Sequence, residues 1–292
     1  MRAAPIEMGE QICYNFLVCL TSTPRPDAAD HRRKGGGTMI LTVDVGNSEI
    51  TFGGFEGDEL RFVAHLATQH RRTDDEYAMQ FDGVLKLHGV DKKEITGAII
   101  SSVVPQLNRS LRRAIHFLFG VEALLVGPGI KTGLGIRCDN PSSVGADLIC
   151  ASVAAGNIYG VPCMIVDIGT ATKMMVVDAS GAFIGVSIIP GVLMGLNALS
   201  AGTAQLPSID LAAPDRVIAK NTADCMKSGV VFGHASMIDG MIERIRKEFG
   251  AELPVYVTGG LAPVIIPHCR HSMQQDQLLV LRGLNIIYRK NN

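Results

Sequence analysis

Hydrophobic and polar positions follow a regular pattern from Met39 onward. Residues 39–43 are apolar or β-branched and lead into Asp44 and a glycine-containing turn, which is typical of a buried strand. The ranges 50–55 and 60–66 are further strand candidates, separated by Glu-Gly-Asp-Glu, whose Gly and Asp favour a tight turn. The pattern therefore predicts a strand followed by a hairpin.

Two helices and two further strands complete this first α/β half. Thr73-Asp-Asp-Glu76 has the form of a capping box, and apolar residues recur after it at helical spacing over 77–85. The other elements predicted here are a strand over 98–104, a helix over 105–119 and a short strand over 123–126.

The same order of elements returns later in the chain. An apolar strand over 163–167 ends in Asp167-Ile-Gly-Thr-Ala-Thr, much as the first ends in Asp44-Val-Gly-Asn-Ser. The elements predicted to follow are strands over 174–178 and 182–188, helices over 192–200 and 223–249, a strand over 255–258 and a strand-like tail over 285–289. This duplication predicts an α/β fold of two related halves, residues 39–150 and 151–292.

Composition narrows the possible functions. The chain of 292 residues has a net charge of -1, so it has no general basic field for a nucleic-acid backbone, and a small-molecule partner fits better. Apolar runs stop well before the roughly 18 residues that span a bilayer, so no membrane helix is predicted. Seven cysteines without a Cys-x-x-Cys pair suggest neither disulfides nor zinc, which favours a cytoplasmic protein.

Residues 1–38 differ from the rest of the chain. Glu7 and Glu10 precede the weakly apolar range 13–20 and no small-residue cleavage site follows, which argues against a secretory signal. Lys34-Gly-Gly-Gly-Thr stands directly before Met39, as a translated ribosome-binding site would. We therefore hypothesise that Met39 is the natural start, and that residues 1–38 are a non-native or disordered extension.

The two Asp-x-Gly turns are the main candidates for chemistry. Asp44 places a carboxylate at a strand end, and Gly46 lets the following amides turn toward an anion, which suits a nucleotide phosphate with Mg²⁺. One such turn alone is more often an ordinary β-turn. Two further features favour nucleotide binding over an ordinary turn. They are the second copy at Asp167 and the Gly259-Gly260 pair, where a backbone without Cβ atoms can lie against adenosine. Together they predict a ribonuclease-H-like or actin-like fold with an ATP cleft between its halves.

Other catalytic signatures are missing from the sequence. It contains no Gly-x-x-x-x-Gly-Lys-Ser/Thr loop, no His-Glu-x-x-His and no Gly-x-Ser-x-Gly. Phosphoryl transfer usually needs a carboxylate that accepts the proton of the attacking hydroxyl, and Asp147 is the candidate. Asp147 stands where a helix begins, so the structural alternative is an N-cap, which its position favours.

Nine ordered motifs give the chain a family resemblance from Met39 to about Lys290. The motifs are Asp44-Val-Gly-Asn, Arg72-Thr-Asp-Asp-Glu-Tyr77, Ser101-Ser-Val-Val-Pro105, Asp139-Asn-Pro, Gly145-Ala-Asp147, Asp167-Ile-Gly-Thr-Ala-Thr172, Pro190-Gly, Thr203-Ala-Gln-Leu-Pro207 and Thr258-Gly-Gly-Leu-Ala262. Together they closely resemble type III pantothenate kinase. The resemblance excludes residues 1–38, in agreement with their composition.

The resemblance implies ATP-dependent phosphorylation of pantothenate, the entry step to coenzyme A, by an actin-like homodimer that uses Mg²⁺ and K⁺ or NH₄⁺. It implies that Asp147 is the general base, that Asp44 lies near Mg²⁺ and that Asp167 binds the monovalent cation. Thr203 is expected to act across the dimer interface. The residues expected at ATP are Asp44, Val45, Gly46, Asn47, Ser48, Glu49, Thr170, Gly259 and Gly260, and those at pantothenate are Cys138, Gly145, Ala146, Asp147, Leu148 and Thr203.

Three positions depart from the family pattern. Leu148 stands where an Arg usually helps to hold the substrate, Cys138 where a Tyr is common, and Lys173 where a second Thr is usual. These departures leave two alternatives open: a kinase for a related small alcohol, or an inactive nucleotide-binding paralogue with a regulatory role. Lys173 is expected either to point to solvent or to reach the phosphates or the cation site.

Overall fold

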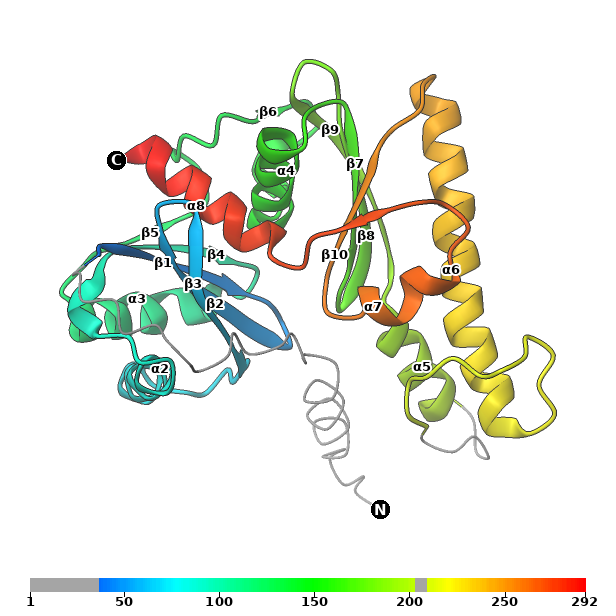
Figure 1. Ribbon diagram of the computed structural model, residues 1–292, viewed down its shortest axis with the longest axis horizontal. Helices are drawn as coiled ribbons and strands as arrows, with labels where there is room; N and C mark the ends of the chain where they lie inside the picture. Colours follow the sequence, from blue (N-terminus) through cyan, green and yellow to red (C-terminus); the bar gives the residue numbers. More distant parts are fainter. Residues whose placement is uncertain (1–36, 203–208) are drawn as a thin grey trace. The chain divides into compact units, whose positions relative to one another are not determined.

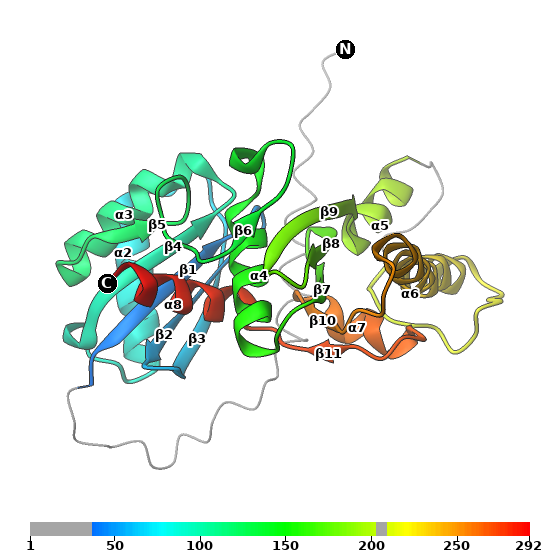
Figure 2. The ribbon, with the colours of Figure 1, turned by 90° about the horizontal axis from the view of Figure 1, so that it is seen from above.

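The computed structural model describes residues 37–202 and 209–292, shown from two directions in Figures 1 and 2. Nearly all of the segment hypothesised to precede the natural start lies outside the described residues. Thr203, expected at the substrate, also lies outside them.

The described chain divides into two compact units. The first-loop unit contains Asp44 and comprises residues 37–165, Met174–Ser187 and Asp276–Asn292. The second-loop unit contains Asp167 and comprises Val166–Lys173 and Ile188–Gln275 among the described residues. These units do not coincide with the predicted halves, because the end of the chain packs on the first-loop unit. The boundary predicted at residue 150 from the duplication stays a prediction.

The first-loop unit is built on a five-stranded sheet with the strand order β3-β2-β1-β4-β5. Its strands are β1 (Met39–Val45), β2 (Glu49–Glu56), β3 (Glu59–Ala67), β4 (Ile95–Ser102) and β5 (Ala123–Leu125). β1 and β3 run antiparallel to β2, whereas β4 runs parallel to β1 and β5. The predicted hairpin is thus confirmed, and Gly57 at its turn has a φ of 61°, which favours glycine.

Helices cover both faces of this sheet (Figure 2). They are α2 (Asp74–Leu87), α3 (Pro105–Phe119), α4 (Ala146–Ile158) and α8 (Leu279–Asn291), with the short 3₁₀ turns η1 (Lys92–Glu94) and η2 (Pro141–Ser143). Ala98 and Ile100 share a core with α2 and α3, whereas Ile99 shares the other core with α4 and α8. Successive strand residues point to opposite faces, so a continuous apolar run fills both layers.

A second sheet has the strand order β11-β10-β7-β8-β9-β6. Its strands are β6 (Gly135–Ile136), β7 (Cys163–Ile168), β8 (Ala171–Val177), β9 (Ala182–Pro190), β10 (Val255–Thr258) and β11 (Gln274–Gln275). The division between the units falls within β7, β8 and β9. The helices of the second-loop unit are α5 (Val192–Ala201), α6 (Thr222–Phe249), α7 (Ala262–Ile265) and the 3₁₀ turn η3 (Ile266–His268).

Two expectations about helices had different outcomes. The capping box of α2 is confirmed, because Thr73 N donates to Glu76 Oε2 at 2.7 Å and Glu76 N donates to Thr73 Oγ1 at 3.3 Å. The strand-like tail over 285–289 is wrong, because these residues belong to α8. The β-branched pair at 286–287 suggested a strand, but Ile287 lies on a helical face that packs on α4. Tertiary packing overrides local propensity here.

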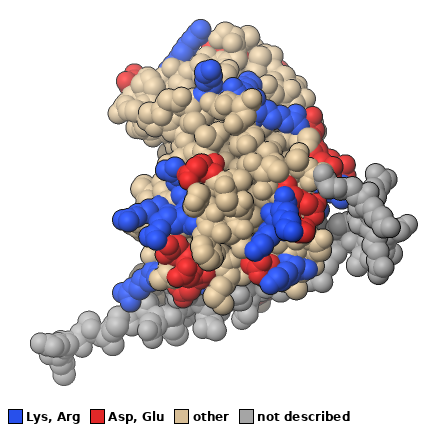
Figure 3. Space-filling view, turned by 90° about the vertical axis from the view of Figure 1, so that its left-hand side faces the viewer, with Lys and Arg blue, Asp and Glu red and all other residues tan. Residues whose placement is uncertain are grey.

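The surface of the first-loop unit mixes charges of both signs. On the face drawn in Figure 3, basic and acidic side chains lie close together among wide uncharged areas. Ion pairs such as Arg113 with Asp74 and Lys86 with Asp82 contribute to this mixture. Among the described residues, the helices are too short or too polar to cross a membrane.

Candidate functional site

The first loop joins β1 to β2 in a tight turn. Gly46 N donates to Glu49 O at 2.9 Å, and a Cβ added at Gly46 would lie only 2.9 Å from the same oxygen. Asn47 and Ser48 at the tip are exposed, whereas Val45 is fully buried. The loop therefore presents its tip to solvent while β1 anchors it, as a phosphate-binding turn requires.

Thr68, which directly follows β3, braces the first loop. Its Oγ1 donates to Gly46 O at 2.7 Å, and its N donates to Ser48 O at 3.1 Å. The Glu49 carboxylate accepts a hydrogen bond from Thr51 Oγ1 and lies 2.8 Å from His65 Nδ1. The side chain of Glu49 is thus held on the hairpin, and its backbone carbonyl shapes the turn. No motif in the sequence indicated Thr68.

Asp147 lies in the first turn of α4 but does not cap it. The N-cap is Gly145, without a side-chain cap, so the N-cap alternative for Asp147 is wrong. A Cβ added at Gly145 would lie 2.5 Å from Asp147 Oδ1, which shows that the carboxylate folds back over this glycine. The helix N-terminus favours a negative charge at this position.

Asp44 and Asp147 lie near the same buried thiol. Burial raises the pKa of Cys150 well above its usual value, and the negative charges of Asp44 and Asp147 raise this pKa further. Both carboxylates therefore lie within electrostatic reach of Cys150. One unit thus contains both acidic residues that the sequence singled out for metal binding and proton transfer, since α4 packs on β4 and β4 pairs with β1.

Four of the residues expected at pantothenate, Gly145 to Leu148, lie at the start of α4. Gly145, Ala146 and Asp147 are consecutive and partly exposed. Leu148 is only 7% exposed, so its side chain belongs to the core. Cys138 is partly buried, and desolvation raises the pKa of its thiol.

The second loop lies against two backbone segments of its own unit. Gly259 has a φ of 96°, and a Cβ there would lie 2.5 Å from Ile168 O. A Cβ on Gly191 would collide with Thr170 O. Leu261 N donates to Ile168 O at 3.2 Å. Gly259 is therefore required by packing, a stronger constraint than the nucleotide contact expected from sequence.

Gly260 differs from its neighbour Gly259. It is exposed, and a Cβ built on it meets no atom within 4 Å. An open stretch of backbone next to the loop is what the predicted adenosine platform needs. The Pro190-Gly motif did not predict the packing role of Gly191, although its position directly before an apolar helix is a sequence signal for it.

Thr172 and Lys173, which follow the second loop on β8, each have a side-chain partner. Lys173 Nζ donates to Asp167 Oδ2 at 2.8 Å, with the two side chains 20% and 16% exposed. Lys173 thus does not point to solvent. Thr172 is fully buried, and its Oγ1 lies 2.8 Å from His234 Nε2 on α6. Burial lowers the pKa of His234, which favours the neutral ring.

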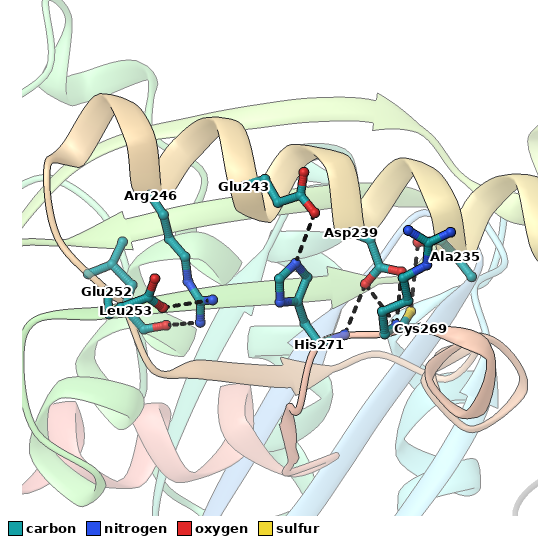
Figure 4. Close-up of polar contacts among 9 residues, drawn as sticks. Ala235, Asp239, Glu243, Arg246, Glu252, Leu253, Cys269 and His271 are labelled. Atoms are coloured by element: carbon teal, nitrogen blue, oxygen red, sulfur yellow. Dashed lines mark hydrogen bonds and ion pairs between the residues drawn. The ribbon is translucent and has the colours of Figure 1, made fainter.

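Helix α6 also holds the segments before and after β10 (Figure 4). Asp239 accepts hydrogen bonds from Arg270 N, at 3.0 and 2.9 Å, and from His271 N at 3.2 Å. Arg246 Nη2 donates to Leu253 O at 2.7 Å. These contacts tie α6 to the segment that enters β10 and to the segment that precedes β11. Asp239, Arg246 and His234 were not predicted, because nothing local in α6 shows which residues face the loop.

Metal binding at this site rests on very few protein ligands. Among residues 37–202 and 209–292, no group of three or more His, Cys, Asp and Glu side chains is arranged to hold a metal ion. Mg²⁺ bound with a nucleotide usually takes one or two carboxylates together with phosphate oxygens. A single carboxylate such as Asp44 fits that mode.

Comparisons with known proteins agree on one family. The family model described as type III pantothenate kinase matches residues 40–244. The type III pantothenate kinase of Moorella thermoacetica is 40% identical over 253 residues, covering 87% of this chain and 100% of the relative. That of Shouchella clausii is 42% identical over 255 residues, with the same coverage.

A solved structure supports the fold. A Listeria monocytogenes protein described as a putative N-acetylmannosamine kinase matches with a TM-score of 0.51 at 11% identity, covering 87% of this chain and 100% of that protein. At this identity the match concerns the fold alone. The predicted α/β fold is thus confirmed, and this chain shares it with the Listeria protein.

Proposed function

Because the chain belongs to the type III pantothenate kinase family, we propose that it transfers the terminal phosphoryl group of ATP to the primary hydroxyl of pantothenate, the first step of coenzyme A biosynthesis. The observation that carries the proposal is that α4, which has Asp147 in its first turn, packs on β4, whose Ser101 pairs with Asp44 on β1. Phosphoryl transfer needs one acidic group for the metal and another for the attacking hydroxyl. These two residues supply both.

Asp147 is the proposed general base. The hydroxyl oxygen of the acceptor attacks the terminal phosphorus, the bond from that phosphorus to the ADP oxygen breaks, and the hydroxyl proton passes to the Asp147 carboxylate. The first turn of α4 favours the negative charge that Asp147 needs beforehand. Gly145 leaves room for the carboxylate.

The two loops are proposed to bind ATP through their backbone. Residues 44–49 supply amides at the exposed tip of the first loop, with Thr170 and the 259–260 glycine pair contributing from the second-loop unit. Asp44 would hold Mg²⁺, which neutralises phosphate charge when it is bound with ATP.

The monovalent cation expected at Asp167 fits poorly. Oδ2 of this carboxylate already accepts from the Lys173 ammonium at 2.8 Å. An exchangeable K⁺ or NH₄⁺ would have to compete for this carboxylate with the ammonium of Lys173, which is covalently part of the chain.

Leu148 bears on the choice of acceptor. Pantothenate carries a carboxylate, and losing a charge-assisted contact costs about 1.5 to 3 kcal/mol, or roughly ten- to a hundredfold in affinity. The apolar, buried Leu148 supplies no such contact. We therefore expect weak pantothenate binding, and this residue favours a related small alcohol as the second candidate acceptor.

We also propose a cytoplasmic homodimer. Ile188, Met194 and Leu199 on β9 and α5 are large apolar residues that are 66%, 49% and 43% exposed. Large exposed apolar side chains on two consecutive elements of one unit suit an interface between copies. Light scattering should give about twice the chain mass of 31.2 kDa, and a value near the chain mass would contradict the dimer.

The function is tested by ADP release from MgATP, with and without pantothenate. A parallel series uses pantothenol, in which a hydroxymethyl group replaces the carboxylate. We expect saturating pantothenate to stimulate ADP release with a high Michaelis constant, and a Leu148→Arg variant to lower this constant for pantothenate but not for pantothenol.

Each of the other outcomes has a definite meaning. If only pantothenol or another small alcohol stimulates ADP release, the acceptor is wrong. If ATP binds and no alcohol stimulates release, the chain is the inactive nucleotide-binding paralogue.

A further inference from the structure

We propose that Lys173 is a built-in counter-ion of the second loop, which neutralises Asp167 so that the loop accepts ATP phosphates without an exchangeable monovalent cation. This inference rests on the proposed function, because it concerns how the same loop receives ATP. It goes further in assigning Lys173 a positioning role.

The ion pair joins the two ends of the loop. Asp167 lies near the end of β7 and Lys173 near the start of β8, and the loop residues between them turn tightly, with Gly169 N donating to Ala171 O at 3.3 Å. The Nζ to Oδ2 distance of 2.8 Å is that of a direct charge-assisted hydrogen bond. Lys173 therefore fixes the loop's width as well as its charge.

Burial separates this pair from an ordinary surface ion pair. The Lys173 and Asp167 side chains are 20% and 16% exposed. For comparison, Lys227 pairs with Asp210 at 2.7 Å in the same unit, but Asp210 is 69% exposed. Exposed pairs contribute little because water screens them, whereas a sheltered carboxylate needs a partner.

Strand geometry directs Lys173 to its place. The neighbouring Thr172 is buried, with its Oγ1 at 2.8 Å from His234 Nε2 of α6. Because successive side chains of a strand point to opposite faces, anchoring Thr172 toward α6 turns Lys173 to the other side, where Asp167 lies.

The charge balance explains why the loop needs this lysine. Within residues 166–173 the charged side chains are Asp167 and Lys173 alone. A lone carboxylate beside ATP phosphates would repel them. The ammonium cancels that charge, and it cannot dissociate as a small ion does.

The test compares cation binding in the wild type, Lys173→Thr and the control Lys227→Thr, without substrates. Thallium(I) serves as the K⁺ probe by ²⁰⁵Tl NMR, and thermal unfolding is compared in KCl and tetramethylammonium chloride at equal ionic strength. We expect only Lys173→Thr to bind thallium saturably and to gain a K⁺-specific rise in melting temperature.

Kinetics supply a second readout. The wild type should have the same Michaelis constant for ATP in both salts. In tetramethylammonium chloride, Lys173→Thr should raise this constant about tenfold, the effect of one lost charge-assisted contact, and K⁺ should restore it.

Three results would overturn the proposal: saturable thallium binding by the wild type, K⁺ stimulation of the wild type, or a folded Lys173→Thr that gains no cation site. If Lys173→Thr does not fold, Lys173→Ser replaces it, and the wild-type measurements still decide. Because cation binding is measured without pantothenate, failure of this proposal is distinguishable from failure of the proposed acceptor.

Discussion

The two phosphate loops share an Asp-x-Gly sequence, but the protein holds them in different ways. The first loop is braced by hydrogen bonds from Thr68, and its tip at Asn47 and Ser48 is exposed. The second loop is held by backbone packing at Gly191 and Gly259 and by the ion pair of Lys173.

This difference shows that two loops with the same motif can differ in which substitutions they tolerate. Hydrogen bonds at the first loop can be lost one at a time for a modest cost. Close backbone contacts at the second loop leave no room for a single methyl group, because packed backbone cannot yield as a flexible side chain does. We therefore expect substitutions in the second loop to threaten the fold, and those near the first loop to affect chemistry more than stability.

The largest expected effect is a loss of turnover caused by a substitution in the first-loop unit. Asp147→Asn keeps the shape of the side chain but removes the proton acceptor, so kcat should fall roughly 10²- to 10⁴-fold. The free energy of unfolding should change by less than about 0.5 kcal/mol. ADP release and urea unfolding measure the two quantities. The matched control Asp82→Asn, on α2 of the same unit, should keep full turnover; retained turnover in Asp147→Asn would remove this residue from the mechanism.

The next largest effect is on stability, at the second loop. Gly259→Ala places a Cβ 2.5 Å from Ile168 O at a φ of 96°. Left-handed strain of about 1 to 2 kcal/mol and overpacking of about 1 to 3 kcal/mol predict a loss of about 2 to 5 kcal/mol. Urea unfolding measures it. Gly260→Ala, which meets no atom within 4 Å, is the control and should unfold like the wild type. Equal stability of the two variants would contradict the close packing.

A smaller effect is expected from the brace of the first loop. Thr68→Val removes the hydroxyl that donates to Gly46 O at 2.7 Å and should cost about 1 kcal/mol of unfolding free energy. The Michaelis constant for ATP should rise as the turn loosens. Thr68→Ser keeps the hydroxyl and should restore both values. If Val and Ser variants behave alike, the hydrogen bond does not hold the loop.

The smallest effect appears only on acidification. Burial lowers the pKa of His234 from 6.5, so the folded state binds its proton less readily than the unfolded state. Stability from this residue is complete above pH 6.5 and is lost as the pH falls through the lowered pKa. His234→Gln, whose amide can still reach Thr172, should flatten this part of the curve. Unfolding free energies between pH 5 and 8 test it, and parallel curves for the two proteins would exclude His234 as the source.

The sequence by itself predicted the elements and the chemistry that depend on near neighbours. Strand and helix periods, the Thr73 capping box and the two Asp-x-Gly turns are local patterns, and each follows from residues a few positions apart. The strand-like tail was the exception, because the β-branched residues of α8 gain more by packing on α4 than their local propensity costs.

Only the tertiary structure decided what surrounds each loop. Whether Lys173 meets solvent or Asp167 depends on the anchoring of Thr172 by a distant helix, and the need for Gly259 arises from Ile168, far away in sequence. The same holds for Thr68, and for Asp239, whose carboxylate binds backbone amides after β10. Local sequence limits which conformations a segment can adopt, but contacts between distant segments select among them, and here those contacts determine the charge and rigidity of the phosphate loops.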